Sequence, residues 1–280
     1  MTDEAAYALL DVGDGRRLER FGERLVDRPA PVDLGPRSAP EWDAADLRFE
    51  RGRGWAGADA ALRPWTVRRA GLTVELRPAS GGQVGLFPEQ APVIDWLAAR
   101  VTERSEPRVL NLFAYTGAAT LAAAAAGARV VHVDASRTAV AWARRNAALS
   151  GLAERPVRWI VDDAVAFVRR ERRRGARYDG VVLDPPSYGR GGDGAVGRGG
   201  AWRIDSGLAD LLADCAALLD PGGPFAVLSA HTPSFGPSRL AAVLASALGV
   251  VPVEIDAEHL DLIGPPGVVL PSGACARWSG

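Results

Sequence analysis

From residue 88 onward, apolar residues follow two alternating patterns. Short, almost wholly apolar runs fit buried strands, and the longer stretches between them carry apolar residues at helical spacing. The strands expected are 108–112, 129–133, 157–161, 180–183 and 225–229, and the helices expected are 89–100, 118–126, 137–150, 165–174, 206–219 and 238–247. Strands that alternate with helices in this way indicate an α/β fold, a parallel sheet with helices on both faces. Ligands of such sheets bind at the carboxyl ends of the strands.

The last part of the chain breaks this alternation. Two strands, 250–255 and 267–277, follow one another through a Pro/Gly-rich link. They predict a terminal β-hairpin added to the parallel sheet, a mixed arrangement that dinucleotide dehydrogenases usually lack.

The first 80 residues are interrupted by turn formers. These are VGDGRR at 12–17, RPAPVDLGPRSAP at 28–40 and RGRGWAG at 51–57. Alternating runs at 66–69 and 72–76 fit half-buried antiparallel strands. We therefore expect a small β-rich N-terminal unit, residues 1–80, followed by an α/β domain, residues 81–280.

The composition excludes several classes of protein. With 280 residues, 48% hydrophobic and 24% charged, the chain can bury a large core, which excludes disorder, collagen-like repeats and a disulfide scaffold. No apolar run approaches the ~20 residues of a spanning helix, and the start, MTDEAAYALL, has acids where a signal peptide has bases. We expect a cytoplasmic protein without membrane contact. Cys215 and Cys275 have no metal-ligand spacing, so we expect neither a metal nor a disulfide.

The charge pattern limits binding to nucleic acid. The net charge is −1 and the chain contains no lysine, so any phosphate contact must use arginine. This balance argues against tight, nonspecific nucleic-acid binding, but it allows an enzyme that contacts RNA through a local patch.

A candidate cofactor site follows the first three strands of the α/β domain. The strand 108–112 runs into Phe113-Ala114-Tyr115-Thr116-Gly117, the second strand ends at Asp134, and the third ends before Asp163. An acid at the end of the second strand can accept hydrogen bonds from ribose hydroxyls. A dinucleotide pyrophosphate needs a GxGxxG motif at this loop, where Gly117 is the only glycine. One glycine suits a ligand without phosphate, such as S-adenosylmethionine. An acid after a strand is most often a helix N-cap, but three at successive strand ends point more strongly to a ligand site.

The fourth strand ends in Asp184-Pro185-Pro186-Ser187-Tyr188. The two prolines hold the chain rigid at the ligand edge of the sheet. Asp184 and the Pro185 carbonyl offer hydrogen-bond acceptors to a nucleobase edge, and Tyr188 offers a face on which a planar ring can stack.

Four segments, LNLFAYTG, HVDASRTAVAWARRNAALSGL, WIVDDAVAFV and LDPPSYGRG, resemble class I S-adenosylmethionine-dependent methyltransferases in their order and spacing. They are most similar to the ribosomal RNA large-subunit methyltransferase group, which has a small N-terminal β-domain. The resemblance implies a Rossmann-like seven-stranded sheet with helices on both faces and an antiparallel last strand. It also implies S-adenosyl-L-methionine as the cofactor and RNA, specifically ribosomal RNA, as the substrate. The oligomeric state stays open.

The resemblance also assigns site residues. The loop Phe113–Gly117 would surround the methionine part, Asp134 would hold the ribose and Asp163 the adenine amine. Gly85-Leu86-Phe87-Pro88-Glu89-Gln90 matches a further family segment, although Ala91 replaces its usual arginine. The full cofactor-binding set is Phe87, Gln90, Asn111, Phe113, Ala114, Tyr115, Thr116, Gly117, Asp134, Ala135, Ser136, Asp163, Ala164 and Asp184. The catalytic set facing the acceptor is Asp184, Pro185, Pro186 and Tyr188.

The acceptor atom is not determined by these motifs. Relatives that methylate cytosine C5 carry a nucleophilic cysteine after the fifth strand, where this chain has Ala230. Cys215 fits a helix core and Cys275 lies in the last strand, so a nitrogen or oxygen acceptor is favoured. The Asp-Pro-Pro-x-aromatic form is nevertheless shared by base-carbon and ring-nitrogen relatives. His231 is a candidate proton acceptor, with a structural role left open.

The positions of the other two histidines and of the arginines in the predicted fold indicate their roles. We expect His132 in the core and His259 on the surface. The cluster 169–174 closes a helix at the edge opposite the cofactor, which favours a solvated helix end. Arg190, Arg198 and Arg203, in the glycine-rich loop after the Asp-Pro-Pro motif, are better placed to meet an anionic substrate.

Two other functions stay open at this point. One is a small-molecule methyltransferase, favoured by the near-neutral charge and by Trp202, Tyr188 and Phe235. The other is a non-catalytic cofactor-binding relative, against which the intact acids and the Asp-Pro-Pro motif argue.

Overall fold

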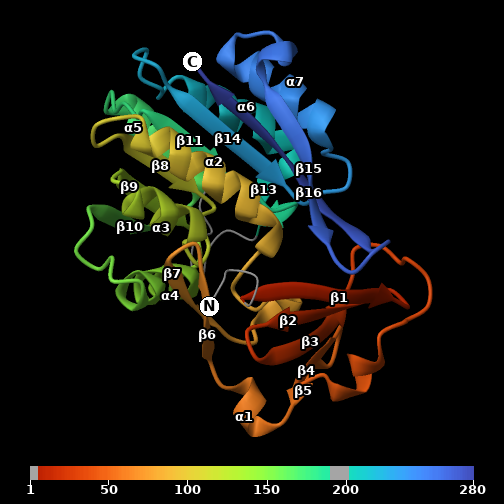
Figure 1. Ribbon diagram of the computed structural model, residues 1–280. Helices are drawn as coiled ribbons and strands as arrows, with labels where there is room; N and C mark the ends of the chain where they lie inside the picture. The colour runs from red at the N-terminus through yellow and green to blue at the C-terminus, as the bar shows by residue number, and fades with distance from the viewer. Residues whose placement is uncertain (1–5, 190–201) are drawn as a thin grey trace. The chain divides into compact units, whose positions relative to one another are not determined.

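The computed structural model describes residues 6–189 and 202–280 and divides into two compact units (Figure 1). Unit 1 consists of Met1–Glu89 and Asp261–Ser272, and unit 2 of Gln90–Leu260 and Gly273–Gly280. A domain boundary at residue 80 stays a prediction. Among the described residues, no helix has the length and apolar character needed to cross a membrane.

Unit 1 contains a five-stranded sheet in the order β1-β2-β3-β4-β5. Its strands are β1 (Tyr7–Gly13), β2 (Arg16–Phe21), β3 (Arg24–Pro29), β4 (Leu47–Glu50) and β5 (Gly54–Gly57). Neighbours are antiparallel except β3 and β4, which are parallel. Asp14 and Gly15, with φ of 54° and 69°, form the two-residue turn between β1 and β2, because such hairpin turns require left-handed backbone.

The rest of unit 1 confirms the expected β-rich character. A short helix, α1 (Asp59–Leu62), precedes a separate antiparallel hairpin of β6 (Trp65–Arg69) and β7 (Leu72–Leu76). Short 3₁₀ helices occur at η2 (Pro40–Ala44), η3 (Ser80–Gly82) and η4 (Pro88–Gln90), the last of which reaches into unit 2.

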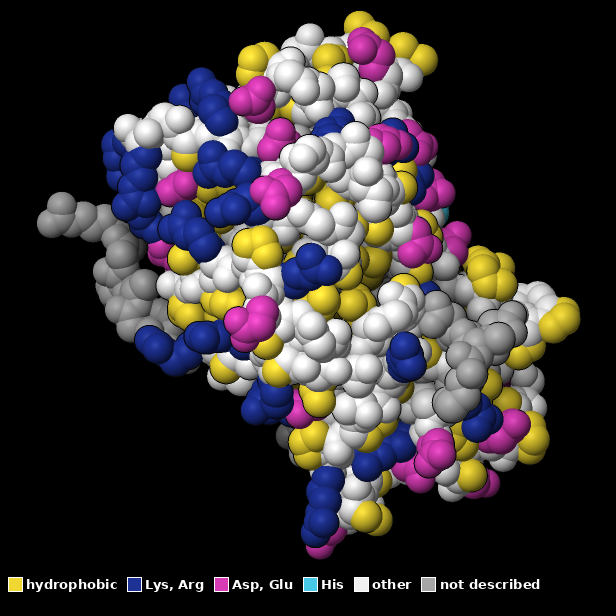
Figure 2. All heavy atoms as spheres, turned by 60° about the vertical axis from the view of Figure 1, so that its left-hand side comes forward, with side chains coloured by type: hydrophobic (Ala, Val, Ile, Leu, Met, Phe, Trp, Pro, Cys, Tyr) yellow, Lys and Arg dark blue, Asp and Glu magenta, His cyan; other side chains and the backbone are white. Residues whose placement is uncertain are grey.

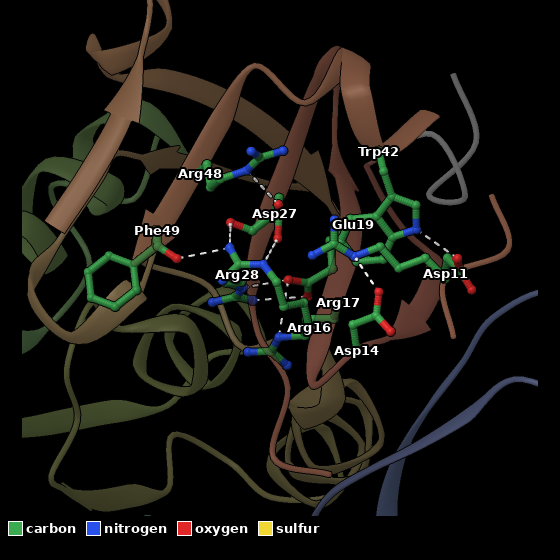
Figure 3. A network of polar contacts seen from close by, with 11 residues as sticks. Asp11, Asp14, Arg16, Arg17, Glu19, Asp27, Arg28, Trp42, Arg48 and Phe49 are labelled. Carbon is green, nitrogen blue, oxygen red and sulfur yellow. Dashed lines mark hydrogen bonds and ion pairs between the residues drawn. The ribbon is translucent and has the colours of Figure 1, made fainter. Parts of the chain in front are cut away.

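A buried network of charged side chains lies within the five-stranded sheet of unit 1 (Figure 3). Glu19 is fully buried and accepts hydrogen bonds from Arg28 and from the Tyr7 hydroxyl. Asp11 accepts from the indole N–H of Trp42 at 2.7 Å. Burial raises the pKa of Asp11, but the N–H donors of residues 38 and 39 and the Trp42 indole outweigh it and lower the pKa to about 2. These acids are therefore ionised and fully paired parts of the fold.

The seven-stranded sheet has the order β10-β9-β8-β11-β14-β16-β15. Its strands are β8 (Arg108–Leu112), β9 (Arg129–Asp134), β10 (Val157–Val161), β11 (Gly180–Leu183), β14 (Phe225–Ala230), β15 (Asp256–Ile263) and β16 (Val269–Ser279). The first five in spatial order are parallel, and β16 is antiparallel to β14. The predicted Rossmann-like α/β sheet with an antiparallel terminal pair is confirmed.

Helices cover both faces of this sheet. They are α2 (Ala91–Thr102), α3 (Ala118–Ala125), α4 (Arg137–Leu149), α5 (Ala164–Arg173), α6 (Ile204–Ala216) and α7 (Pro237–Leu248). One apolar core joins α2 and α3 to the sheet, and a separate core joins α5, α6 and α7 to it. Helix α4 packs on β9 and β10. A two-stranded ladder of β12 (Tyr188–Gly189) and β13 (Trp202–Arg203) completes the unit.

The strand expected at 250–255 is wrong. Residues Pro252–Glu254 form a 3₁₀ helix, η5, and β15 begins only at Asp256. Proline has no N–H to donate to a sheet, so a strand interior is a poor place for Pro252.

Candidate active site

The carboxyl ends of the parallel strands lie in register at one edge of the sheet. Leu112 pairs with Val133 on one side and with Leu183 on the other, and Leu183 pairs in turn with Leu228. The residues that follow these positions therefore leave the sheet at the same level. This arrangement brings together the predicted segments after β8, β9, β11 and β14.

The loop after β8 has an unusual backbone. Phe113, Tyr115 and Gly117 have φ of 55°, 47° and 89°. The left-handed region costs a non-glycine residue roughly 1–2 kcal/mol, so the two aromatic residues store strain that the surrounding contacts must offset. A side chain at Gly117 would place its Cβ 3.0 Å from the Cβ of Ala143 in α4, so glycine is needed for both its backbone angle and its size.

Several contacts hold this loop in place. The Ala114 N–H donates to the Val133 carbonyl at 3.1 Å, and the Asn146 side chain donates to the Thr116 carbonyl at 3.0 Å. The Tyr115 ring lies 6.1 Å from that of Trp142. The loop is thus anchored to β9 and α4 along its length.

Asp134, at the end of β9, connects the loop to the start of α4. Its Oδ2 accepts the Tyr115 N–H and its Oδ1 accepts the Ser136 N–H, both at 2.8 Å. Ser136 caps α4 through its hydroxyl, and the half-buried Ala135 lies between the two. Burial raises the pKa of Asp134, although the two N–H groups oppose this shift. Each carboxylate oxygen retains a lone pair, as ribose recognition would require.

A buried hydrogen-bond chain lies beneath the loop. The Asn111 amide donates to the Thr120 hydroxyl, which bonds His132 Nδ1, each at 2.9 Å. His132 is a core residue, as expected, and burial lowers its pKa to about 3. The Asn111 amide is therefore directed into the protein, and its predicted role in cofactor binding stays a prediction.

Asp163 caps α5, accepting the Ala166 N–H on Oδ1 at 2.8 Å. It is exposed, and no described residue donates to its Oδ2, so the N-cap role and a ligand role are compatible. Ala164, the first residue of α5, is buried in the core. Val161, which sequence reasoning missed, is 43% exposed and pairs in register with Asp134, so it places apolar surface next to the two acids.

Asp184, directly after β11, lies in a polar cluster with residues from two other parts of unit 2. These are Gln90, just before α2, and Ser229 and His231, at the end of β14 and just after it. Its Oδ1 accepts the Ser229 hydroxyl at 2.7 Å and lies 3.5 Å from His231 Nε2. Gln90 Nε2 lies 3.1 Å from the Ser229 hydroxyl and 3.2 Å from His231 Nε2. Burial acts to raise the pKa of Asp184, but His231 and the Ser229 hydrogen bond outweigh it and hold the pKa below its ordinary value. Asp184 is therefore ionised at neutral pH, with its side chain 31% exposed.

The segment after Asp184 presents an aromatic ring and an arginine to solvent. Tyr188 is 66% exposed, and the Arg203 guanidinium carbon lies 5.0 Å from its ring centroid. No described residue forms an ion pair with Arg203 or donates to the Pro185 carbonyl. The Pro186 carbonyl, in contrast, accepts the indole N–H of Trp202 at 2.7 Å.

The structure does not test every residue predicted for this edge. Phe87 belongs to unit 1, so its role stays a prediction. Arg190 and Arg198 lie outside the described residues. The arginines at the end of α5 are largely ion-paired: Arg170 with Asp162, and both Arg169 and Arg172 with Asp214. Figure 2 likewise shows acidic side chains between the arginines that gather on its upper part.

The structure also describes both cysteine thiols and the side chains that could act as metal ligands. Cys275 lies opposite Ser229 in the β14–β16 pairing, closer to Asp184 than its place in the last strand indicates. Burial raises the pKa of Cys275 to about 11, and burial also raises the pKa of the Cys215 thiol, so both are protonated at neutral pH. Within the described ranges, no group of three or more potential metal ligands is present.

The strand order with its antiparallel β16, together with acids at successive strand ends and a single glycine in the loop after β8, defines a Rossmann-like methyltransferase. Residues 46–246 match the family model of S-adenosylmethionine-dependent methyltransferases. The chain belongs to this family. The acceptor groups of Asp134, Asp163 and Asp184 suit the hydroxyls, amine and positive charge of its cofactor, S-adenosylmethionine.

Comparison with individual proteins agrees with the family assignment. An S-adenosylmethionine-dependent methyltransferase from Agrobacterium tumefaciens is 34% identical, with a TM-score of 0.88 over 99% of this chain and 92% of that one. Ribosomal RNA large subunit methyltransferase K/L of Marinobacter nauticus is 33% identical over 85% of this chain. Ribosomal RNA large subunit methyltransferase I of Shewanella denitrificans is 33% identical over 73% of it. The chain spans only 32% and 50% of the lengths of these two relatives.

Proposed function

We propose that this protein transfers a methyl group from S-adenosylmethionine to a base of RNA, and specifically of ribosomal RNA. The observation that carries the proposal is the exposed Tyr188 ring with Arg203 over it, separated from Asp184-Pro185-Pro186 only by Ser187. An exposed ring next to an arginine that forms no ion pair with any described residue offers stacking to a base and charge to a phosphate. The names of the two ribosomal RNA methyltransferase relatives support the same substrate class. A ribosomal substrate implies a cytoplasmic enzyme.

The cofactor-binding residues have distinct roles in this proposal. Asp134 accepts hydrogen bonds from ribose hydroxyls, Asp163 Oδ2 accepts one from the adenine amine, and the strained loop 113–117 surrounds the methionine part. When bound, the cofactor supplies an electrophilic methyl group on its sulfonium. The side chains then need only to align the acceptor atom and to accept one proton.

The acceptor side favours nitrogen. Asp184 Oδ2 and the Pro185 carbonyl are acceptors to which no described residue donates, and a base edge carrying N–H groups can donate to both. A cytosine C5 acceptor would need a thiolate, whereas both cysteines are buried with raised pKa values. Because Asp184 has a lowered pKa and is a weak base, the adjacent His231 imidazole is the better proton acceptor.

The test is transfer of labelled methyl from S-adenosylmethionine to total RNA from a strain that lacks this gene, followed by nucleoside mass spectrometry. We expect label in an N-methylated base of ribosomal RNA, and none when Asp184→Asn replaces the wild-type enzyme. A labelled 5-methylcytidine would contradict the nitrogen assignment. Absence of label in RNA, with cofactor binding shown by calorimetry, would contradict the RNA substrate.

A small-molecule acceptor is the second candidate. The net charge of −1 and the ion pairs of the α5 arginines favour it, because Arg169, Arg170 and Arg172 are paired with acids and are less available to a polyanion. Label released into a small-molecule extract of the same strain, and none in RNA, would support this alternative.

A further inference from the structure

Trp202 contacts two segments that methyl transfer must hold together. Its indole Nε1 donates to the Pro186 carbonyl at 2.7 Å, within the segment that faces the acceptor. Its ring packs on Phe113, at a centroid distance of 5.2 Å, within the loop assigned to the cofactor. Trp202 belongs to neither segment, so it forms a third element that touches both.

Backbone contacts and a glycine fix the position of Trp202. It pairs with Gly189 in the β12–β13 ladder, and Ile204, two residues later, donates its N–H to the Ser187 carbonyl at 3.1 Å. On the side of α6, a Cβ built at Gly207 would lie 2.8 Å from Cζ3 of Trp202. The absence of a side chain at Gly207 therefore makes room for the indole.

We propose that Trp202 is a positioning residue that sets the acceptor segment 184–188 against the cofactor loop. The inference rests on the proposed function. The two prolines fix φ at consecutive residues, so one hydrogen bond at the Pro186 carbonyl orients the whole turn. Methyl transfer needs reacting atoms about 3 to 3.5 Å apart, so a small rotation of this turn lowers the rate while each partner still binds.

Two substitutions test this role from opposite sides. Trp202→Phe keeps an aromatic ring beside Phe113 and removes the N–H donor to Pro186. Gly207→Ala removes no contact, improves helix propensity in α6 and displaces the indole. We expect each to lower kcat about tenfold or more, while the Kd for S-adenosylhomocysteine stays within twofold of wild type.

A purely structural role gives a different result, because Trp202→Phe and Gly207→Ala would then lower the melting temperature and leave kcat of the folded enzyme within twofold of wild type. Trp278→Phe is the matched control: Trp278 is half-buried in β16 and packs on the core of the same sheet. We expect it to leave kcat unchanged. If kcat of both Trp202→Phe and Gly207→Ala remains within twofold of wild type, the proposal is overturned.

Amide hydrogen exchange separates this inference from the proposed function. If the wild-type enzyme does not label RNA, the proposed function fails, and exchange of the Ile204 amide then decides the positioning role. We expect this amide, which bonds Ser187, to exchange at least about fivefold faster in Trp202→Phe and at the wild-type rate in Trp278→Phe. Unchanged exchange in Trp202→Phe would overturn the inference.

Discussion

Asp134→Ala is predicted to weaken binding of S-adenosylhomocysteine by about 3 to 4 kcal/mol, two to three orders of magnitude in Kd. Two effects contribute. Hydrogen bonds from ribose hydroxyls to a carboxylate are worth roughly 1.5 to 3 kcal/mol. The substitution also removes the acceptor of the Tyr115 N–H, which helps to hold Tyr115 at φ 47°. Relaxation of this left-handed residue releases roughly 1 to 2 kcal/mol, which binding must then restore.

The assay is isothermal titration calorimetry at pH 7.5, with thermal unfolding to verify that the variant is folded. Asp163→Ala is the matched control, since it removes an exposed carboxylate at the neighbouring strand end and an N-cap worth about 1 kcal/mol of unfolding free energy. We expect it to reduce affinity about tenfold at most. A folded Asp134→Ala variant that binds within threefold of wild type would refute the reasoning.

The raised pKa of Asp134 adds a pH dependence to the same measurement. Because burial raises the pKa, the carboxylate of the free protein becomes protonated at higher pH than that of an ordinary aspartate. Affinity should therefore fall as the pH is lowered toward this raised value, and the dependence should be absent in Asp134→Asn.

Four further predictions concern chemistry and stability. Asp184→Asn should lower kcat at least about 100-fold with cofactor affinity nearly unchanged. His231→Gln should remove the acid limb of the kcat–pH profile, because Asp184, with its lowered pKa, stays ionised over that pH range. Methyl transfer assayed from pH 5 to 9 checks both predictions. Because His132 has a pKa of about 3 in the folded protein, only the unfolded chain takes up its proton as the pH falls below about 6.5. The unfolding free energy of the wild type should therefore fall by about 1.4 kcal/mol per pH unit in this range. Urea unfolding should show no such decrease for His132→Asn. Asp11→Asn should lower the unfolding free energy at pH 7 by about 2 to 3 kcal/mol, and because the lowered pKa stabilises only the ionised fold, urea unfolding should show this difference shrinking from about pH 4 toward pH 2.

Local patterns predicted most of unit 2 because each element leaves its own signal in the sequence. The strands 108–112, 157–161 and 180–183 match their predicted bounds, since short apolar runs between turns have few alternative structures. The acids Asp134 and Asp184 were found because they follow such strands directly. The prediction of a strand at 250–255 is wrong because it followed the apolar pattern and gave too little weight to Pro252.

Contacts between distant residues leave no comparable signal. Segment 261–272 belongs to unit 1, where Leu262 and Leu270 pack with Leu9 and Val12, yet it continues the alternating pattern of the terminal hairpin. The bond from Trp202 to Pro186 depends on the β12–β13 ladder, whose strands have two residues each. No periodicity can be read from strands so short, so this contact emerges only from the structure.

The two-segment composition of unit 1 also affects how the protein is made. Leu262 and Leu270 are synthesised about 250 residues after Leu9 and Val12, a delay on the order of tens of seconds at roughly 5 to 20 residues per second. Strand β16, which lies between β14 and β15, is synthesised after both. During translation the nascent chain therefore carries an incomplete apolar cluster and an open strand edge, and its yield should depend on chaperones that protect such surfaces until the last strand is inserted.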